Sequence, residues 1–320
     1  NMRKFLALLT VLVMSIGIYA FAQGEPVTIE NMGRTTVYEK APERAFLFSY
    51  SQAEYFAALG LEDKVVAFVP GMYTIDDVLP EYREAIGKMP LFTDGLERGS
   101  PNSIEFILDK EPDFAFGTAY NFTARTGGAP EDYDAADIKI YATRGTYIAK
   151  SSLNDTYEDI LNLGKIFRVE ECAEALVAEM RAEEEAVREL LKDVEPVSVF
   201  AYDSGEGTLY TIGNEGIENE LIRIAGGKNI YEDVDKHYFA TSAESVVDAN
   251  PDVILVWDYN ITDSVEEKIA YLKGLVEMQD VNAVQNDRFP SVPCYAVFPS
   301  IQNIEAIKTI AKGLHPELFD

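Results

Sequence analysis

The sequence predicts an α/β protein with two lobes, each built on a parallel sheet, and one long linking helix between them. Three observations predict this fold class. Apolar runs of strand length alternate with segments of helical periodicity. One pattern occurs twice, as "SIEFILDKEPDFAF" from Ser103 and as "SAESVVDANPDVIL" from Ser242. A long helical stretch without Gly or Pro lies between the two copies.

The first half of the chain alternates strand-like and helical segments. "RAFLFSY" (44–50) predicts a strand, and "SQAEYFAALG" (51–60) a helix that ends at its glycine. Further strands are predicted at "KVVAFVP" (64–70), at 114–116 and at "DIKIYATRG" (137–145), with a long loop over 71–102. This alternation favours a parallel sheet.

The second half begins with the long helix and then repeats the alternation. Residues 170–194 predict an amphipathic helix with Leu176, Met180, Val187 and Leu191 on one stripe. "VSVFAYD" (197–203), "VILVW" (253–257) and "YAVFPS" (295–300) predict strands, and 219–227 and 303–319 predict helices. The expected organisation is a signal peptide (1–22), an N-terminal lobe (23–150), a linking helix region (151–195) and a C-terminal lobe (196–320).

The doubled pattern indicates an internal duplication. Each copy predicts a capping box, from Asn102 to Glu105 and from Thr241 to Glu244, followed by a Pro-Asp turn into a buried strand. Capping by itself would account for both glutamates.

The first residues predict export. "MRKFLALLTVLVMSIGIYAFAQG" has a basic start, an apolar stretch and an Ala-Phe-Ala cleavage site, which is typical of a secretory signal peptide. No cysteine follows this stretch, so the sequence predicts a cleaved, periplasmic protein rather than a lipid-anchored one. Cys172 and Cys294 are expected to be two separate buried thiols.

Composition excludes some partners. The chain has 27 basic and 55 acidic residues and a net charge of −28, which argues against binding to nucleic acid or anionic membranes. An exported α/β hydrolase is the alternative of a different class. It needs a Gly-x-Ser-x-Gly elbow and a suitably placed histidine, and the sequence has no such elbow. We therefore do not expect an enzyme.

Several segments, in order along the chain, resemble one family. They are "APERAFLFSYSQAEYFAALGLEDKVVAF", "PNSIEFILDKEPDFAFG", "NELIRIAGGKNIYEDV" and "HPELF". With the duplication and the signal peptide, the chain resembles the substrate-binding proteins of ABC importers, in the helical-backbone class for ferric siderophores, haem or cobalamin. The resemblance implies two Rossmann-like lobes, a ligand cleft between them and a monomer. It also implies that Glu105 and Glu244 dock on arginine pockets of the permease.

Ligands of open α/β sheets bind at the carboxyl ends of the strands. The expected ligand is an iron chelate or a tetrapyrrole, with no intrinsic cofactor. Arg125 and Arg144 would pair with its acidic groups. Two histidines, His237 and His315, are too few for a direct zinc or manganese site, and His237 is expected on a surface loop. The resemblance implies a cleft rich in tryptophan for a cobalamin-binding member of the family. Trp257 is the single tryptophan of this chain, which weakens the cobalamin alternative. The candidate ligand-binding residues are Tyr50, Ser51, Tyr73, Tyr120, Asn121, Arg125, Arg144, Tyr202, Trp257, Tyr259 and Phe298.

Overall fold

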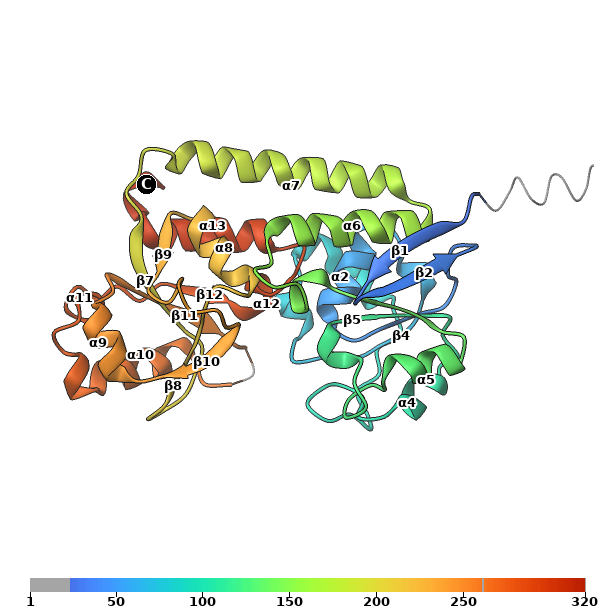
Figure 1. The fold of residues 1–320 in the computed structure, drawn as a ribbon, viewed down its shortest axis with the longest axis horizontal. Coiled ribbons are helices and arrows are strands. Elements are labelled where there is room, and N and C mark those ends of the chain that lie inside the picture. Colours follow the sequence, from blue (N-terminus) through green and yellow to red (C-terminus); the bar gives the residue numbers. More distant parts are fainter. Residues whose placement is uncertain (1–23, 261, 320) are drawn as a thin grey trace, which may run out of the picture.

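The structure is a computed structural model and describes residues 24–260 and 262–319. Two lobes, each built around a four-stranded parallel sheet, lie under one long helix that extends over both (Figure 1). The predicted fold class is therefore confirmed. The predicted signal peptide lies outside the described residues.

The N-terminal lobe contains a sheet with the strand order β4-β3-β5-β6. Its strands are β3 (Ala45–Leu47), β4 (Val65–Phe68), β5 (Phe114–Gly117) and β6 (Lys139–Ala142). Its helices are α2 (Tyr50–Ala58), α3 (Arg83–Gly87), α4 (Ile104–Leu108) and α5 (Pro130–Ala135), with 3₁₀ turns η1 (Glu62–Lys64), η2 (Ile75–Asp77), η3 (Pro80–Tyr82), η4 (Ala119–Asn121) and η5 (Arg144–Thr146).

An antiparallel hairpin that the sequence did not predict precedes this sheet. It consists of β1 (Val27–Asn31) and β2 (Arg34–Tyr38). The buried Asn31 amide donates to the carbonyl of Ala142 (2.9 Å) and accepts from its N–H (2.8 Å). One side chain thus satisfies both backbone groups at the end of β6 and holds the hairpin on the lobe.

The C-terminal lobe contains a sheet with the strand order β12-β11-β7-β9. Its strands are β7 (Val197–Tyr202), β9 (Gly227–Asn229), β11 (Val253–Asp258) and β12 (Ser291–Pro293), and β8 (Leu209–Ile212) pairs separately with β10 (Tyr238–Thr241). Its helices are α8 (Ile217–Ile224), α9 (Ala243–Ala249), α10 (Val265–Gly274), α11 (Asn282–Gln285), α12 (Cys294–Val297) and α13 (Asn303–Leu314), with η6 (Val276–Met278) and η7 (Pro316–Leu318).

The two sheets share one topology. In each, the first strand lies between the second and the third, and the fourth lies outside the third. Glu111 and Asn250, at matching places before the Pro-Asp turns, both have positive φ (50° and 45°). The N–H of Asp113 bonds to Arg44 O, and that of Asp252 bonds to Ser198 O. The repeated sequence therefore folds into the same helix, turn and strand in both lobes.

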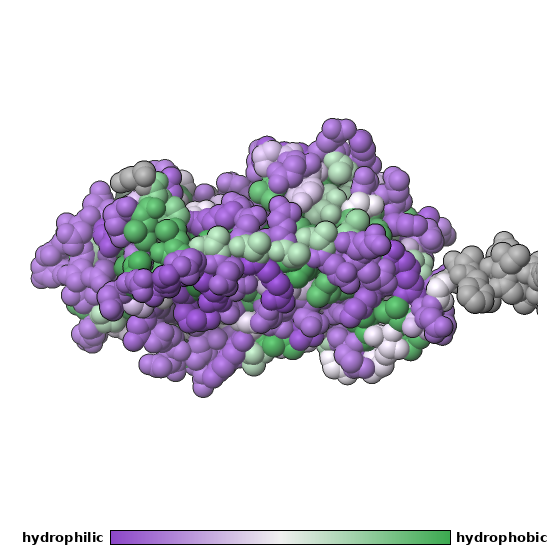
Figure 2. Space-filling model, turned by 90° about the horizontal axis from the view of Figure 1, so that it is seen from above, coloured by the Kyte–Doolittle hydropathy of each residue, from purple (hydrophilic) through white to green (hydrophobic). Residues whose placement is uncertain are grey.

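The linking region contains two helices, α6 (Leu153–Phe167) and α7 (Glu170–Leu191). The long helix was predicted and α6 was not. Helix α7 runs above α6 in one lobe and above α13 in the other (Figure 1), and it packs against both. The face seen from above is mostly hydrophilic, with scattered apolar groups (Figure 2). The buried residues of helix α7 are Ala173, Val177, Met180, Val187 and Leu191.

Three local predictions are wrong. The first three residues of "YAVFPS" (295–297) belong to helix α12 and not to a strand, because β12 ends at Pro293, which has no N–H for a sheet hydrogen bond. Cys294 is buried as predicted, but Cys172 is exposed, since the α7 surface that faces the core begins at Ala173. Both thiols are free.

The third wrong prediction is the pair of capping boxes. The helices begin one residue later than predicted, so Ser103 and Ser242 are the N-caps and each glutamate is the second helical residue. The Ser242 hydroxyl accepts from Ser245 N, while Ser103 makes no such bond to the backbone of its helix. Neither glutamate therefore completes a capping box.

Within residues 24–260 and 262–319, we find no helix long and apolar enough to cross a membrane.

Candidate functional site

A cavity of about 260 Å³ lies between the lobes at the carboxyl ends of the N-terminal strands. Segments that follow all four strands of that sheet contribute to it, as expected for a ligand site of an open α/β sheet. The C-terminal lobe closes it with two residues that follow α12. The lining residues are Phe48, Ser49, Ser51, Gln52, Gly71, Met72, Tyr73, Ser100, Thr118, Tyr120, Asn121, Thr146, Phe298 and Pro299.

Two glycines bring the long loop over 71–102 back to the cavity. Gly71 has a φ of 63°, and its N–H donates to the carbonyl of Gly99 (2.9 Å). A Cβ on residue 99 would lie 1.7 Å from the Gly71 oxygen, so that position accepts only glycine. The close approach places the next residue, Ser100, in the cavity wall.

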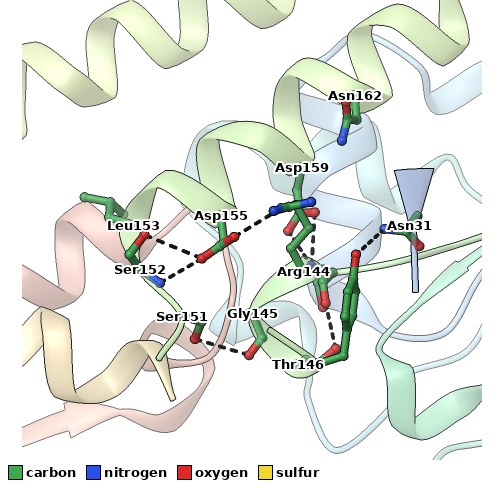
Figure 3. A network of polar contacts seen from close by, with 12 residues as sticks. Asn31, Arg144, Gly145, Thr146, Ser151, Ser152, Leu153, Asp155, Asp159 and Asn162 are labelled. Carbon is green, nitrogen blue, oxygen red and sulfur yellow. Dashed lines mark hydrogen bonds and ion pairs between the residues drawn. The ribbon is translucent and has the colours of Figure 1, made fainter. Parts of the chain in front are cut away.

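A buried polar network holds the loop after β6 (Figure 3). Arg144 Nε donates to Asp155 (3.1 Å), and its backbone N–H donates to both carboxylate oxygens of Asp159 (3.1 Å each). Both acids lie on α6. The Thr146 hydroxyl donates to Thr143 O (2.7 Å) and accepts from the N–H of Ala119 (2.9 Å). Helix α6 thus fixes the position of Thr146 in the cavity.

The C-terminal lobe meets the cavity through tight contacts. A Cβ on residue 145 would lie 2.5 Å from the Pro299 ring, so Gly145 permits close approach of the two lobes. The Tyr73 ring packs edge-on against Tyr295, with ring centres 4.9 Å apart. This aromatic contact crosses the lobe boundary beside Phe298.

His237 connects the lobes at one side of the cavity. Its Nδ1 lies 3.3 Å from the Tyr120 hydroxyl, and its Nε2 lies 3.1 Å from the buried Glu218 carboxylate. Burial opposes the charged imidazolium, but the hydrogen bond and the charge of Glu218 outweigh it and raise the pKa of His237. Tyr238 also donates to Glu218 (2.7 Å). His237 thus lies on the loop before β10, where a loop was predicted, but it is partly buried between the lobes (22% exposed).

Five predicted ligand-binding residues line the central cavity: Ser51, Tyr73, Tyr120, Asn121 and Phe298. Tyr50 lies beside it, with its ring packed edge-on against Phe68 (5.2 Å). Arg125 is exposed and outside the lining. Arg144 is also outside the lining, where it pairs with Asp155.

The other three candidates lie in the C-terminal lobe. Trp257 is fully buried in the core. The Tyr259 hydroxyl donates to Asp203 (2.6 Å). Tyr202 lines a second cavity of about 250 Å³, together with Ser204, Gly205, Glu206, Asp263, Glu267, Lys268 and Tyr271.

Sequence reasoning missed part of the central wall. Phe48, Gln52 and Thr146 lie next to predicted strand ends, so a wider window around each end would have included them. Met72 directly precedes the predicted Tyr73, so the same window would have included it. Ser100 comes from the far end of the long loop, and the contact between Gly71 and Gly99 brings it to the cavity. Pro299 lies within the segment 295–300, which was predicted as a strand and whose first three residues fold as a helix.

The two repeated glutamates, Glu105 and Glu244, are both exposed, one on each lobe. The Ser103 hydroxyl holds the pKa of the Glu105 carboxyl below its ordinary value. The described residues include no group of three or more His, Cys, Asp or Glu side chains placed to hold a metal ion.

A model of the periplasmic binding proteins matches residues 47–294, which span both lobes and the cleft. The chain belongs to the periplasmic binding protein family. This binding protein is thus a component that holds a solute and is not an enzyme, and the resemblance seen in the sequence is confirmed.

The chain is similar to known proteins over most of its length. An uncharacterised ABC transporter substrate-binding lipoprotein of Bacillus subtilis, YvrC, is 25% identical over 92% of this chain and 87% of its own. A periplasmic binding protein from Veillonella parvula has the same fold, with a TM-score of 0.82 and 27% identity over 92% of this chain and 99% of its own. A protein named for Fe3+-hydroxamate transport, from Saccharomonospora viridis, gives a TM-score of 0.76 and 24% identity, and the match covers 92% of this chain and 99% of that protein.

Proposed function

We propose that this protein captures a ferric chelate of the siderophore type and delivers it to the membrane permease of an ABC importer. The observation that carries the proposal is the central cavity. It lies between two lobes, and aromatic rings and neutral polar groups line it, as is usual for sites that bind small molecules. At about 260 Å³ it is slightly smaller than most such sites, so part of a chelate would extend to the cleft mouth.

The names of the relatives support this role. YvrC is named as an ABC transporter substrate-binding protein, and the Saccharomonospora viridis protein is named for Fe3+-hydroxamate transport. The alternative is the same transport role with haem or cobalamin as the ligand. The burial of Trp257 in the core removes the tryptophan that the cobalamin alternative needs in the cleft.

Export and docking complete the proposal. The N-terminal segment would direct a cleaved, monomeric protein across the cytoplasmic membrane. Glu105 and Glu244 would then pair with arginines of the permease. Each glutamate is exposed, and neither completes a capping box, so both carboxylates are available for such pairs.

The test is a thermal shift assay with ferric chelates, haemin, cyanocobalamin and zinc or manganese chloride. We expect stabilisation by a ferric chelate of about 2.7 kcal/mol at a hundredfold excess over Kd, because only the native state binds. Phe298→Ala should reduce this shift, since it removes the ring that closes the cavity. Phe239→Ala, which removes a partly buried aromatic outside the cavity, should leave it intact. Stabilisation by a metal salt and by no chelate or tetrapyrrole would contradict the proposal.

A further inference from the structure

The wall of the central cavity consists of neutral side chains. Its fourteen lining residues, all within the described part of the chain, include no Lys, Arg, His, Asp or Glu. Several polar groups of the wall are already paired. The Ser49 hydroxyl donates to Gln52 (2.6 Å), and the Thr118 hydroxyl donates to Asn121 (2.9 Å). The wall therefore offers no side-chain charge to balance that of a ligand.

The two arginines predicted at the strand ends, Arg125 and Arg144, do not supply a positive charge to this wall. Arg144 is matched by Asp155, and both side chains are largely shielded from solvent (25% and 11% exposed). Taking Arg144 from this pair would leave the carboxylate of Asp155 without its partner. Arg125 is exposed and outside the lining. An anionic ligand would meet neither guanidinium in the wall.

Carboxylates lie behind the wall. Glu218 is 1% exposed; it pairs with His237, which offsets its charge when the imidazole is protonated, and it accepts a hydrogen bond from Tyr238. Two tyrosines of the wall, Tyr73 and Tyr120, lie within the influence of these carboxylates. Burial raises the pKa of both Tyr73 and Tyr120, and the charge of Glu218 raises each further. Asp77 adds to this effect at Tyr73. The groups that disfavour a phenolate here also disfavour a ligand anion.

We infer that the cavity selects chelates without net negative charge, such as a ferric trihydroxamate, over anionic ones such as a ferric tris-catecholate or haem. The inference rests on the proposed function and narrows its ligand class. An anion that enters this cleft loses water and gains no cationic partner in the wall, because His237, which lies behind Tyr120, is already paired with Glu218. A neutral hydroxamate complex loses much less hydration. Neutral wall hydroxyls and amides suit the oxygen atoms of such a complex.

The experiment is calorimetric titration of the full chain with ferrichrome (neutral), ferric enterobactin (trianionic), haemin and cyanocobalamin (neutral). We expect ferrichrome to bind at least about tenfold more tightly than ferric enterobactin at low salt. Added salt should narrow the gap, because it screens the repulsion.

A charge-reversal variant separates charge from shape. Met72 lines the cavity and is 41% exposed, so Arg at this position can reach the ligand without unfolding the protein. Met72→Arg should improve the binding of ferric enterobactin relative to that of ferrichrome by about tenfold. Val276→Arg is the matched control, because it adds the same charge at an exposed residue (82%) outside the cavity, and it should change the binding of neither chelate. Melting temperatures of both variants check that each is folded.

The outcomes separate this inference from the proposed function. Tighter binding of ferric enterobactin or haemin by the unmodified protein would overturn the charge selection and leave the transport role standing. If Met72→Arg did not alter the preference between the two chelates, that preference would be due to shape, and the inference of charge selection would again be wrong. If the protein bound cyanocobalamin and no iron chelate, the proposal that its ligand is an iron chelate would be wrong, and the selection of neutral ligands would be supported. Binding of none of the four probes would overturn both.

Discussion

Glu54 lies where the two lobes meet, and its carboxyl group is fully buried. It accepts hydrogen bonds from the Tyr295 hydroxyl (2.5 Å), from Gln302 Nε2 (2.9 Å) and from the N–H of Leu79 (2.7 Å). Burial raises its pKa to about 7, although these three bonds act in the opposite direction. A single carboxyl group therefore connects both lobes beside the cavity.

The raised pKa of Glu54 predicts a pH-dependent free energy of unfolding. Between about pH 4.5 and 7 the native state keeps a proton that the unfolded state has lost. Glu54 should therefore contribute stability at low pH, up to about 3 kcal/mol, and this contribution should disappear as pH rises through 7. Urea unfolding at pH 5 and pH 7.5 measures it, because Glu54→Gln should lose this part of the pH dependence.

Glu158→Gln is the control, because Glu158 is exposed on α6. It should follow the pH dependence of the unmodified protein. If Glu54→Gln kept the same pH dependence as well, the buried carboxyl would not titrate in this range.

At the scale of elements, the duplicated helix, turn and strand present one acidic side chain from each lobe. Helices α4 and α9 begin at matching places in the repeat, with Glu105 and Glu244 as their second residues. Because neither glutamate closes a capping box, substitution of the carboxylate should cost little stability.

We therefore expect Glu105→Gln and Glu244→Gln to impair docking and not ligand binding. A charge-assisted pair that becomes buried on docking is worth roughly 2–5 kcal/mol when one partner is removed. The double variant should bind ligand normally, melt at nearly the same temperature and stimulate the transporter ATPase poorly. Reconstituted permease with its ATPase provides the measurement.

Matched controls exist in both lobes. Glu131 and Glu266 are exposed and lie in the first turns of α5 and α10, outside the repeat. Their Gln variants should stimulate the ATPase fully. Normal stimulation by the Glu105→Gln, Glu244→Gln double variant would show that these glutamates do not dock.

At the scale of the whole molecule, several contacts hold the lobes together besides α7. The N–H of Ser151 bonds to Glu215 O (3.0 Å), and the N–H of Leu153 bonds to the Glu220 side chain (2.5 Å). The Thr156 hydroxyl donates to Asn303 (2.7 Å). Helix α6 is thereby attached to the C-terminal lobe while it packs on the N-terminal one.

These connections predict small motions on ligand binding. Opening the cleft widely would require bending α7, which breaks backbone hydrogen bonds, or would break the contacts of α6. The radius of gyration should change by less than ~1 Å between the free and bound protein. Small-angle scattering with and without a ligand identified by thermal shift measures this. A contraction of several ångströms would instead indicate a flexible hinge.

Local sequence pattern predicted much of the fold and part of the site. Hydrophobic periodicity and the Pro-Asp turns depend on neighbouring residues, so the strands around the repeat and the long helix were predicted correctly. The cleft position followed from the strand ends. Single-residue boundaries did not follow, as the N-caps at Ser103 and Ser242 show, since neighbouring polar residues can each cap a helix.

The sequence by itself determined the duplicated α/β architecture, the family and the exposed glutamate pair, because each depends on patterns along the chain. Only the tertiary structure decided which side chains face the ligand. Arg144 meets Asp155 on α6, and Glu54 meets Tyr295 and Gln302, whose positions in the chain are 241 and 248 residues away. Charge in the cleft depends on such distant pairings, and no pattern of neighbouring residues encodes them.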